Sequence, residues 1–287
     1  MPSNYQVANS YNDWLQEVYA VIVLYNLELI ESPTFNSLLK SNNSTSAPLD
    51  ILVYDNSPSA QELGKCERLN LEYVHHPSNT GVSVAYNVAF EKARLKRKKL
   101  LLLLDQDTDF PGSFLFQYYQ SLKEFPAENI LAPILKANKI IISPFKPWLG
   151  GGKPIRKPKA GKHNLADESL VNSGLLISTE AFEKSGGYDE RFPLDFSDYS
   201  FCERLRKKCQ SFVVVPAIGQ HDHSSFTLSF KEELHRFNQY CQSAIHFKEY
   251  YNKNTLVKVR LITRAIRLTV KYKSLQFLAA MVNHVFR

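Results

Sequence analysis

The sequence predicts an α/β fold built on a mostly parallel, doubly wound sheet. Continuous apolar runs at 18–26, 49–57 and 98–107 are typical of strands that are buried on both faces. Helix-like stretches alternate with these runs over about the first 110 residues, as in parallel sheets. Each run ends in polar residues, and ligands bind where the strands of such sheets end.

The elements follow in order along the chain. We expect strands at 18–26, 49–57, 71–76, 98–107 and 171–178. We expect helices after the first strand to about Lys40, at 79–96, at 179–185 and at 195–208. The stretch at 142–164 is rich in Pro, Gly and Lys and is predicted to be a long loop, either mobile or closing over a site. From about Phe230 the pattern is helical, which divides the chain into a domain at 1–228 and a helical, basic extension at 229–287.

Composition and charge narrow the function classes. The 287 residues are 44% hydrophobic and 22% charged, as in an ordinary globular protein, and no stretch approaches 18 consecutive apolar residues. The polar N-terminal sequence has no signal-peptide pattern, and four cysteines without a CxxC pair indicate reduced thiols, so we expect a cytoplasmic protein. The net charge is +7, and residues 250–287 hold eight Lys or Arg and no Asp or Glu, which points to an acidic surface.

The stretch LLLLLDQDTDFPGS (100–113) places three aspartates at alternate positions after an apolar strand. An EF-hand loop is excluded, because its sixth and twelfth positions would be Phe110 and Phe116. Asp105 and Asp107 would point to the same side and suit Mg²⁺ or Mn²⁺ bridging a diphosphate. The alternative is a solvated turn in which Asp109 caps a helix.

Seven motifs together resemble the family 2 glycosyltransferases in order and spacing. They are VIVLYN, ILVYDNS, NTGVSVAYN, LLLLDQDT, SGLLIS, GGYDERF and DFSDYSFCERLRKK, and they cover roughly 18–225. The DQD strand end and the D-x-x-D helix start are similar to the rhamnosyltransferase-like branch. The resemblance implies a GT-A fold and an inverting transfer from a dTDP- or UDP-sugar to a hydroxyl of a cell-surface polysaccharide or lipid-linked glycan.

The resemblance also assigns the donor and metal sites. The donor residues it implies follow the strand ends: Tyr25, Asn26, Asp55, Asn56, Asn79, Gly81, Asn87 and Asp105. Gly81 would let backbone amides approach an anion at a helix start, although these residues could also form ordinary turns. The implied metal ligands are Asp105, Asp107 and His221, with His223 as the alternate. An imidazole ligand suits Mn²⁺ better than Mg²⁺.

The family's acidic motif at the acceptor site aligns on Ser197-Asp198. A hydroxyl is a poor nucleophile near neutral pH, so a positioned base is needed, and we assign this role to Asp198. Asp195 is the second candidate, and either aspartate could instead cap a helix. Ser197 and Ser200 replace acidic residues of the family pattern. The acceptor contacts expected are Asp195, Trp148 and Gly174.

The C-terminal extension contains a predicted basic amphipathic helix. One line of it holds Arg260, Arg264, Arg267 and Lys271, and the other side holds Leu261, Ile262, Ala265, Ile266 and Leu268. We expect this helix to bind peripherally to an anionic inner membrane, where a lipid-linked acceptor would reside. The alternative is a helix that packs on the domain with a solvated basic edge.

Other function classes stay open at this point. A nucleotidyltransferase shares acidic strand ends, but LYNLELIESP lacks the Gly-rich basic loop expected after the first strand. A non-catalytic nucleic-acid-binding protein fits the basic tail, but no helix-turn-helix, finger or RNP signature is present, so we expect no nucleic-acid partner. An inactive sugar- or lipid-binding relative would fit the serines at 197 and 200.

Overall fold

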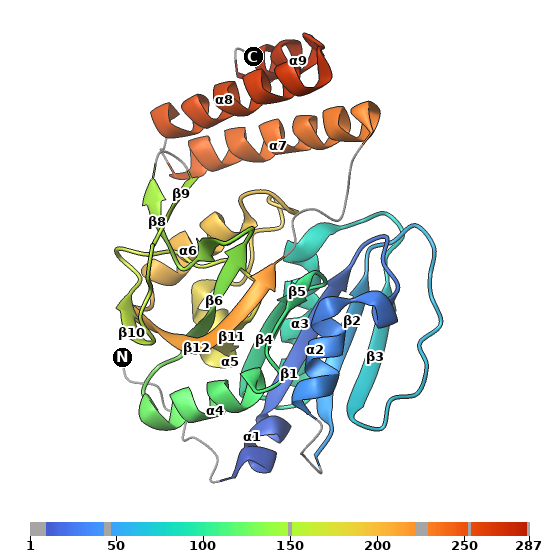
Figure 1. Ribbon diagram of the computed structural model, residues 1–287, viewed down its shortest axis with the longest axis vertical. Coiled ribbons are helices and arrows are strands. Elements are labelled where there is room, and N and C mark those ends of the chain that lie inside the picture. The colour runs from blue at the N-terminus through green and yellow to red at the C-terminus, as the bar shows by residue number, and fades with distance from the viewer. Residues whose placement is uncertain (1–9, 43–46, 149–150, 222–228, 252–253, 286–287) are drawn as a thin grey trace.

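The computed structural model describes residues 10–42, 47–148, 151–221, 229–251 and 254–285 (Figure 1). A mixed sheet forms its centre. Its strands run in the order β10 (Gly161–Asn164), β12 (Ser211–His221), β6 (Ile130–Ala137), β11 (Leu175–Ser178), β4 (Leu100–Asp105), β1 (Val18–Leu24), β2 (Leu49–Asp55) and β3 (Leu69–His75). Two short strands join it off this path: β5 (Thr108–Asp109) pairs with β12, and β7 (Ile140–Ser143) pairs with β6.

The half of the sheet formed by β3, β2, β1 and β4 is parallel, which confirms the predicted fold class. The chain passes outward from β1 to β2 and β3, then returns to place β4 on the other side of β1. The strand order therefore reverses between β1 and β4. Ligands of doubly wound sheets bind at the carboxyl ends of the strands at such a point.

Helices cover both faces of the sheet, and β1 shows why. Alternate residues of β1 belong to the two separate hydrophobic cores, Val18 and Ala20 to one, Tyr19 and Val21 to the other. The first core is covered by α1 (Tyr11–Glu17), α2 (Pro33–Ser41) and α4 (Phe114–Glu124). The second is covered by α3 (Gly81–Leu95), α5 (Thr179–Ser185) and α6 (Ser197–Arg206).

The prediction of a long loop at 142–164 was wrong. This stretch contains the end of β7, the hairpin of β8 (Phe145–Trp148) with β9 (Gly151–Pro154), and β10, which pairs with β12. The strands are short and are rich in Gly, Pro and Lys, so they carry little of the apolar pattern from which strands are recognised. Their backbone pairing, which the sequence does not display, determines the structure.

Three helices follow the sheet and stack at one end of the molecule (Figure 1): α7 (Phe230–Tyr251), α8 (Asn254–Tyr272) and α9 (Gln276–Val285). Their helical nature was predicted. Their core also includes Phe192 and Phe196, which belong to the segment leading into α6. The helical extension and the sheet domain therefore share one hydrophobic cluster. None of the helices among the described residues has the length and apolarity needed to cross a bilayer.

We predict that Gly81→Ala lowers the melting temperature. Gly81 has φ +86°, and a Cβ there would lie 2.2 Å from the carbonyl oxygen of Pro193, which accepts a hydrogen bond from the Val82 amide at 2.7 Å. We expect a loss of about 2 kcal/mol or more, measured by thermal unfolding. Gly64→Ala is the control, because nothing lies within 4 Å of its added Cβ. Equal melting temperatures for the two variants would contradict the close approach of Pro193 to α3.

Candidate functional site

Three potential metal ligands lie together where β4 ends. The carboxylates of Asp105 and Asp107 and the ring of His221 offer ligand atoms that all lie within 4.8 Å of one another. The structure thus brings together the three residues assigned to the metal from the sequence. The alternate ligand, His223, lies outside the described residues.

Pairing of β12 with β5 places the histidine in this cluster. His221 is opposite Thr108 in the antiparallel register, and its Nδ1 lies 2.8 Å from Thr108 Oγ1 and 3.4 Å from Asp107 Oδ1. Ser173 Oγ lies 2.9 Å from Thr108 Oγ1 and accepts a hydrogen bond from the Asp105 amide at 3.3 Å. A connected set of hydroxyls therefore fixes the ring and the strand end relative to each other.

The chemistry of the cluster fits a divalent cation. Two carboxylates and one imidazole are a donor set that Mn²⁺ accepts readily and Mg²⁺ accepts less well. Tyr86 donates its hydroxyl to Asp105 Oδ1 at 2.7 Å, and Thr108 holds the ring of His221. Such surrounding hydrogen bonds orient the ligands in metal sites.

Gln106 joins the ends of β1 and β4. Its Oε1 accepts from the Tyr25 amide at 2.7 Å, and its Nε2 donates to the Tyr25 carbonyl at 3.2 Å. Thr34 supports the same turn by donating to the carbonyl of Asp105 and accepting from the amide of Thr108. Neither Gln106 nor Thr34 was assigned a role from the sequence. The buried position of Gln106 directly between the two aspartates was the available signal.

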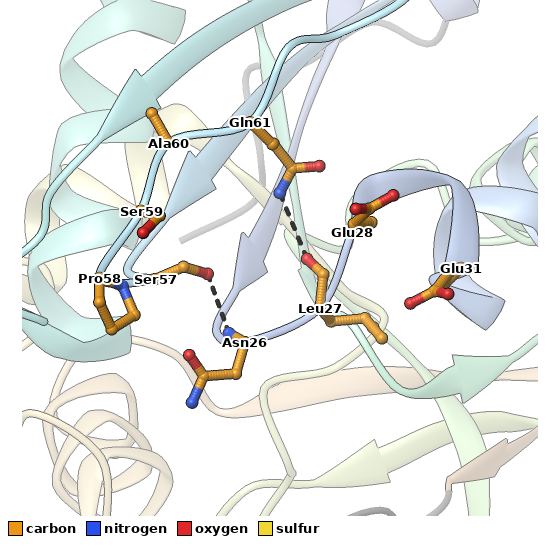
Figure 2. Close-up of a pocket in the computed structure, with 9 residues that line it drawn as sticks. All are labelled: Asn26, Leu27, Glu28, Glu31, Ser57, Pro58, Ser59, Ala60 and Gln61. Carbon is orange, nitrogen blue, oxygen red and sulfur yellow. Dashed lines mark hydrogen bonds between the residues drawn. The ribbon is translucent and has the colours of Figure 1, made fainter.

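A pocket of about 400 Å³ opens beside this rim (Figure 2). It lies between the loops that follow β1 and β2, and its lining residues are Asn26, Leu27, Glu28, Glu31, Ser57, Pro58, Ser59, Ala60 and Gln61. Two hydrogen bonds join the loops, from the Asn26 amide to Ser57 Oγ (2.9 Å) and from Gln61 Nε2 to the Leu27 carbonyl (3.3 Å). Of the donor residues assigned from the sequence, Asn26 lines this pocket.

Asp55 supports the pocket from beneath. It is fully buried, and its carboxylate accepts hydrogen bonds from the Ser57 amide, from Gln61 Nε2 and from the Tyr73 hydroxyl. Burial raises the pKa of Asp55, but these hydrogen bonds outweigh it and hold the pKa below its ordinary value. In this structure Asp55 fixes the loop from Ser57 to Gln61, and the direct donor contact expected of it stays a prediction.

The other expected donor residues have mixed surroundings. Asn56 is buried and its Oδ1 accepts from the Thr80 amide at 3.1 Å, so it holds the turn that leads into α3. Asn79, in that turn, is exposed with φ 50°. Asn87 contacts the segment that leads into α6: its side-chain amide donates to the Tyr188 carbonyl at 3.0 Å and accepts from the Tyr188 amide at 2.9 Å. This amide therefore holds the chain ahead of α6, and the donor contact expected of Asn87 stays a prediction.

Two of the three expected acceptor residues are not placed at a site. Gly174 is buried with φ +81°, and an added Cβ would lie 2.5 Å from Pro133 Cγ. Its amide donates to the Leu103 carbonyl at 2.8 Å, so it is a packing position directly before β11, and the acceptor contact expected of it stays a prediction. The backbone of Trp148 ends β8, but its side chain lies outside the described residues.

Asp198 is in the first turn of α6 and is partly buried. The N-cap of α6 is Phe196, in a left-handed conformation with φ 68°, so the capping role considered for Asp195 or Asp198 was wrong. Burial, and then the negative charges of Asp105 and Asp195, together raise the pKa of Asp198 to about 7. Asp198 is therefore electrostatically coupled to the rim of β4 and titrates in the range suited to a general base.

Ser197 and Ser200, which replace acidic residues of the family pattern, are both buried. Ser197 Oγ donates to the Leu194 carbonyl at 2.8 Å and accepts from Asn172 Nδ2 at 3.3 Å. These contacts tie the start of α6 to the segment before β11. Ser197 therefore supports the backbone that carries Asp198.

Two arginines of α8 hold the same segment from the other side. Arg264 lies 3.5 Å from the carboxylate of Asp195, and its guanidinium stacks 4.0 Å from the ring centre of Tyr240. Arg260 donates to the Tyr199 hydroxyl at 3.3 Å. The helical extension thus contacts the residues on both sides of Asp198 and partly balances the charge of Asp195.

Comparison with known proteins gives a family match. The profile described as glycosyl transferase family 2 matches residues 19–179, which is more than half of the chain. A dTDP-rhamnosyl transferase of Shigella flexneri, RfbF, is 25% identical over 194 residues, covering 65% of this chain. The chain spans 62% of the length of that relative.

Solved structures give the fold. TarS 1–349 of S. aureus has a TM-score of 0.53 at 13% identity, covering 93% of this chain and 88% of that one. GalNAc-T7 with UDP, GalNAc and Mn²⁺ has a TM-score of 0.55 at 13% identity, covering 77% and 48%. At these identities the likeness shows the fold alone, and the predicted GT-A fold is confirmed.

We predict that Asp107→Ala and His221→Ala each weaken Mn²⁺ binding at least about tenfold, because each removes one of the three grouped ligands. Electron paramagnetic resonance of free Mn²⁺ measures the affinity directly. Asp109→Ala is the matched control: Asp109 is exposed, only two residues from Asp107, and outside the cluster. Equal affinities for all three variants would rule out a cation at this cluster.

Proposed function

The chain belongs to glycosyl transferase family 2, and we propose that it transfers a sugar from a nucleotide-diphosphate donor to an acceptor hydroxyl. The observation that carries this proposal is the grouping of Asp105, Asp107 and His221 where the strand order reverses, at the end of β4. Asp198 is electrostatically coupled to Asp105 in this group. This reaction requires charge stabilisation for a diphosphate and a base for a hydroxyl; the cluster would supply the first and Asp198 the second.

The donor would lie across the ends of β1 and β4. We propose that the pocket between the loops after β1 and β2 takes the nucleoside, because the carboxylates of Glu28 and Glu31 border it and would repel phosphate. Those carboxylates can accept hydrogen bonds from ribose hydroxyls or base N–H groups. The diphosphate would then lie at the cluster of Asp105, Asp107 and His221.

Asp198 is proposed to accept the proton of the acceptor hydroxyl while the oxygen attacks the anomeric carbon. The bond from that carbon to the diphosphate oxygen breaks on the opposite side, so the configuration inverts and a nucleoside diphosphate leaves. A divalent cation held by Asp105, Asp107 and His221 would supply positive charge to that leaving group. Arg264 would balance the negative charge of Asp195, because that charge opposes the ionisation of Asp198.

The finer features of the substrates are also proposals. The similarity to the Shigella flexneri dTDP-rhamnosyl transferase supports rhamnose and a dTDP donor, with UDP-sugars as the alternative. Mn²⁺ is favoured over Mg²⁺ by the imidazole in the cluster. We propose a glycan acceptor linked to a lipid or a cell-surface polysaccharide, and peripheral association of the enzyme with an anionic membrane from the cytoplasmic side. The basic composition of residues 250–287 supports that association.

We predict that Asp198→Asn abolishes transfer while donor binding survives, because the amide cannot accept the acceptor proton. Transfer is followed by nucleoside-diphosphate release, and donor binding by thermal shift with the nucleotide sugar and Mn²⁺. In the wild type, activity should fall as pH decreases through about 7, where Asp198 becomes protonated. A cation beside Asp105 would offset the repulsion between Asp105 and Asp198 and move this fall in activity to lower pH. Full turnover by Asp198→Asn would refute the assignment of the base.

We predict that Arg264→Gln moves the acidic limb of the activity profile to higher pH. Loss of the guanidinium leaves the charge of Asp195 unbalanced, and that charge raises the pKa of Asp198. Arg267→Gln is the matched control, since it removes the same charge from an exposed position one turn later in α8. The two pH–rate profiles are compared with a soluble acceptor. Superimposable profiles would show that Arg264 does not act through Asp195 on the base.

A further inference from the structure

A row of apolar residues lies on the surface of α8 that faces solvent. Val259, Ile262, Ile266 and Val270 follow one another at helical spacing and are 45%, 44%, 51% and 72% exposed. We call these four residues the α8 stripe. Exposed apolar residues that form a continuous row mark an interaction surface more often than isolated ones do.

The stripe is not the surface expected from the sequence. The basic line predicted for docking is divided, because Arg260 and Arg264 turn toward Tyr199 and Asp195 of the sheet domain. The apolar side is divided too. Leu261, Ala265 and Leu268 are buried in the core of the helical extension, whereas Ile262 and Ile266 are exposed. The helix therefore presents three faces: one in its own core, one toward α6 and one toward solvent.

Basic side chains flank the stripe. Lys258, Arg267, Lys271 and Lys273 are exposed on the same helix or directly after it. No acidic residue occurs from Tyr250 to Arg287. An apolar row bordered by lysine and arginine is the pattern of a helix that lies in the interface of a bilayer.

We infer that the α8 stripe inserts into the surface of an anionic lipid bilayer, with the flanking lysines and arginines contacting lipid phosphates. This inference rests on the proposed function, because docking would give the enzyme access to a lipid-linked acceptor. Figure 1 shows α7 next to the sheet domain and α8 and α9 on its far side, so the outer layer of the helical extension would meet the membrane.

Charge favours a lipid surface over a second copy of the chain. Two copies that paired through the α8 stripe would bring their basic flanks together, and like charges at an interface cost free energy. Anionic headgroups instead complement every charged residue beside the stripe. An anionic bilayer would therefore bury the apolar row and also neutralise the basic side chains beside it.

Docking through this stripe would also place the catalytic segment close to the bilayer. The same helix holds Tyr199, the residue after Asp198, through Arg260 at 3.3 Å. An acceptor hydroxyl near the headgroups would therefore be presented to an enzyme whose base-bearing helix is braced by the membrane-bound helix. The contact would link membrane binding and catalysis through α8.

The test is co-flotation of the full chain with vesicles of phosphatidylcholine alone or mixed with phosphatidylglycerol. Wild-type protein should float with the anionic vesicles only. The double variant Ile262→Asp/Ile266→Asp should lower the partition coefficient by at least about tenfold per isoleucine. Leu95→Asp is the matched control: Leu95 is 77% exposed at the end of α3, away from the extension, and its substitution should leave flotation unchanged.

A second variant tests the charges. Arg267→Gln/Lys271→Gln/Lys273→Gln should weaken binding to anionic vesicles by roughly fivefold per charge. Circular dichroism and nucleotide release with a soluble acceptor verify that the variants are folded, and these readouts do not depend on lipid. Loss of flotation with retained soluble activity supports the inference. Unchanged flotation of the isoleucine variant overturns it, as does a wild-type dimer in sedimentation that the isoleucine substitutions convert to a monomer. A failed glycosyl transfer with intact flotation would count against the proposed function only.

Discussion

The site depends on holding several carboxylates near one another at the end of a buried sheet. Asp105 and Asp107 follow a strand whose preceding residues are almost fully buried, and Asp198 approaches from a helix on one face. Burial raises the pKa of Asp198, and repulsion by the neighbouring carboxylates adds to this effect. The Tyr86 hydroxyl donates to the carboxylate of Asp105, and the ring of His221, held by Thr108, lies beside the carboxylate of Asp107. A cation or a protonated base relieves the repulsion, so the same strain that opposes folding favours binding and proton uptake.

The parallel half of the fold could be predicted because its signals are local. A strand such as Leu100–Asp105 is apolar throughout since both of its faces are covered, and its polar end marks the rim of the sheet. The rim residues Asn26, Asp105 and Asp107 followed from this geometry without knowledge of the connections. Parallel strands must end at the same edge, so polar residues after different strands converge.

What could not be predicted depends on contacts between distant residues. Pairing of the two-residue strand β5 with β12 fixes His221, yet a strand of that length has no periodicity to detect. The packing contacts of Asn87 and Gly174 were not foreseen, because an amide or a glycine serves packing and binding equally well in a motif. Their real partners, Tyr188 and Pro133, lie far along the chain or on another strand. The inward orientation of Arg264 was hidden for the same reason, since a basic residue on a helix gives no sign of a carboxylate elsewhere.

The cluster formed by Phe192 and Phe196 with the C-terminal helices has a consequence for recombination between relatives. A crossover placed directly before α7 would divide this cluster, because the helices of one relative would then pack against Phe192 and Phe196 of another. Chimeric enzymes that exchange the whole segment from Asp189 to the C-terminus would keep the two rings, the proposed base Asp198 and the arginines of α8 together. The proposed acceptor preference and membrane attachment would then be transmitted together, separately from the half of the sheet proposed to bind the nucleotide.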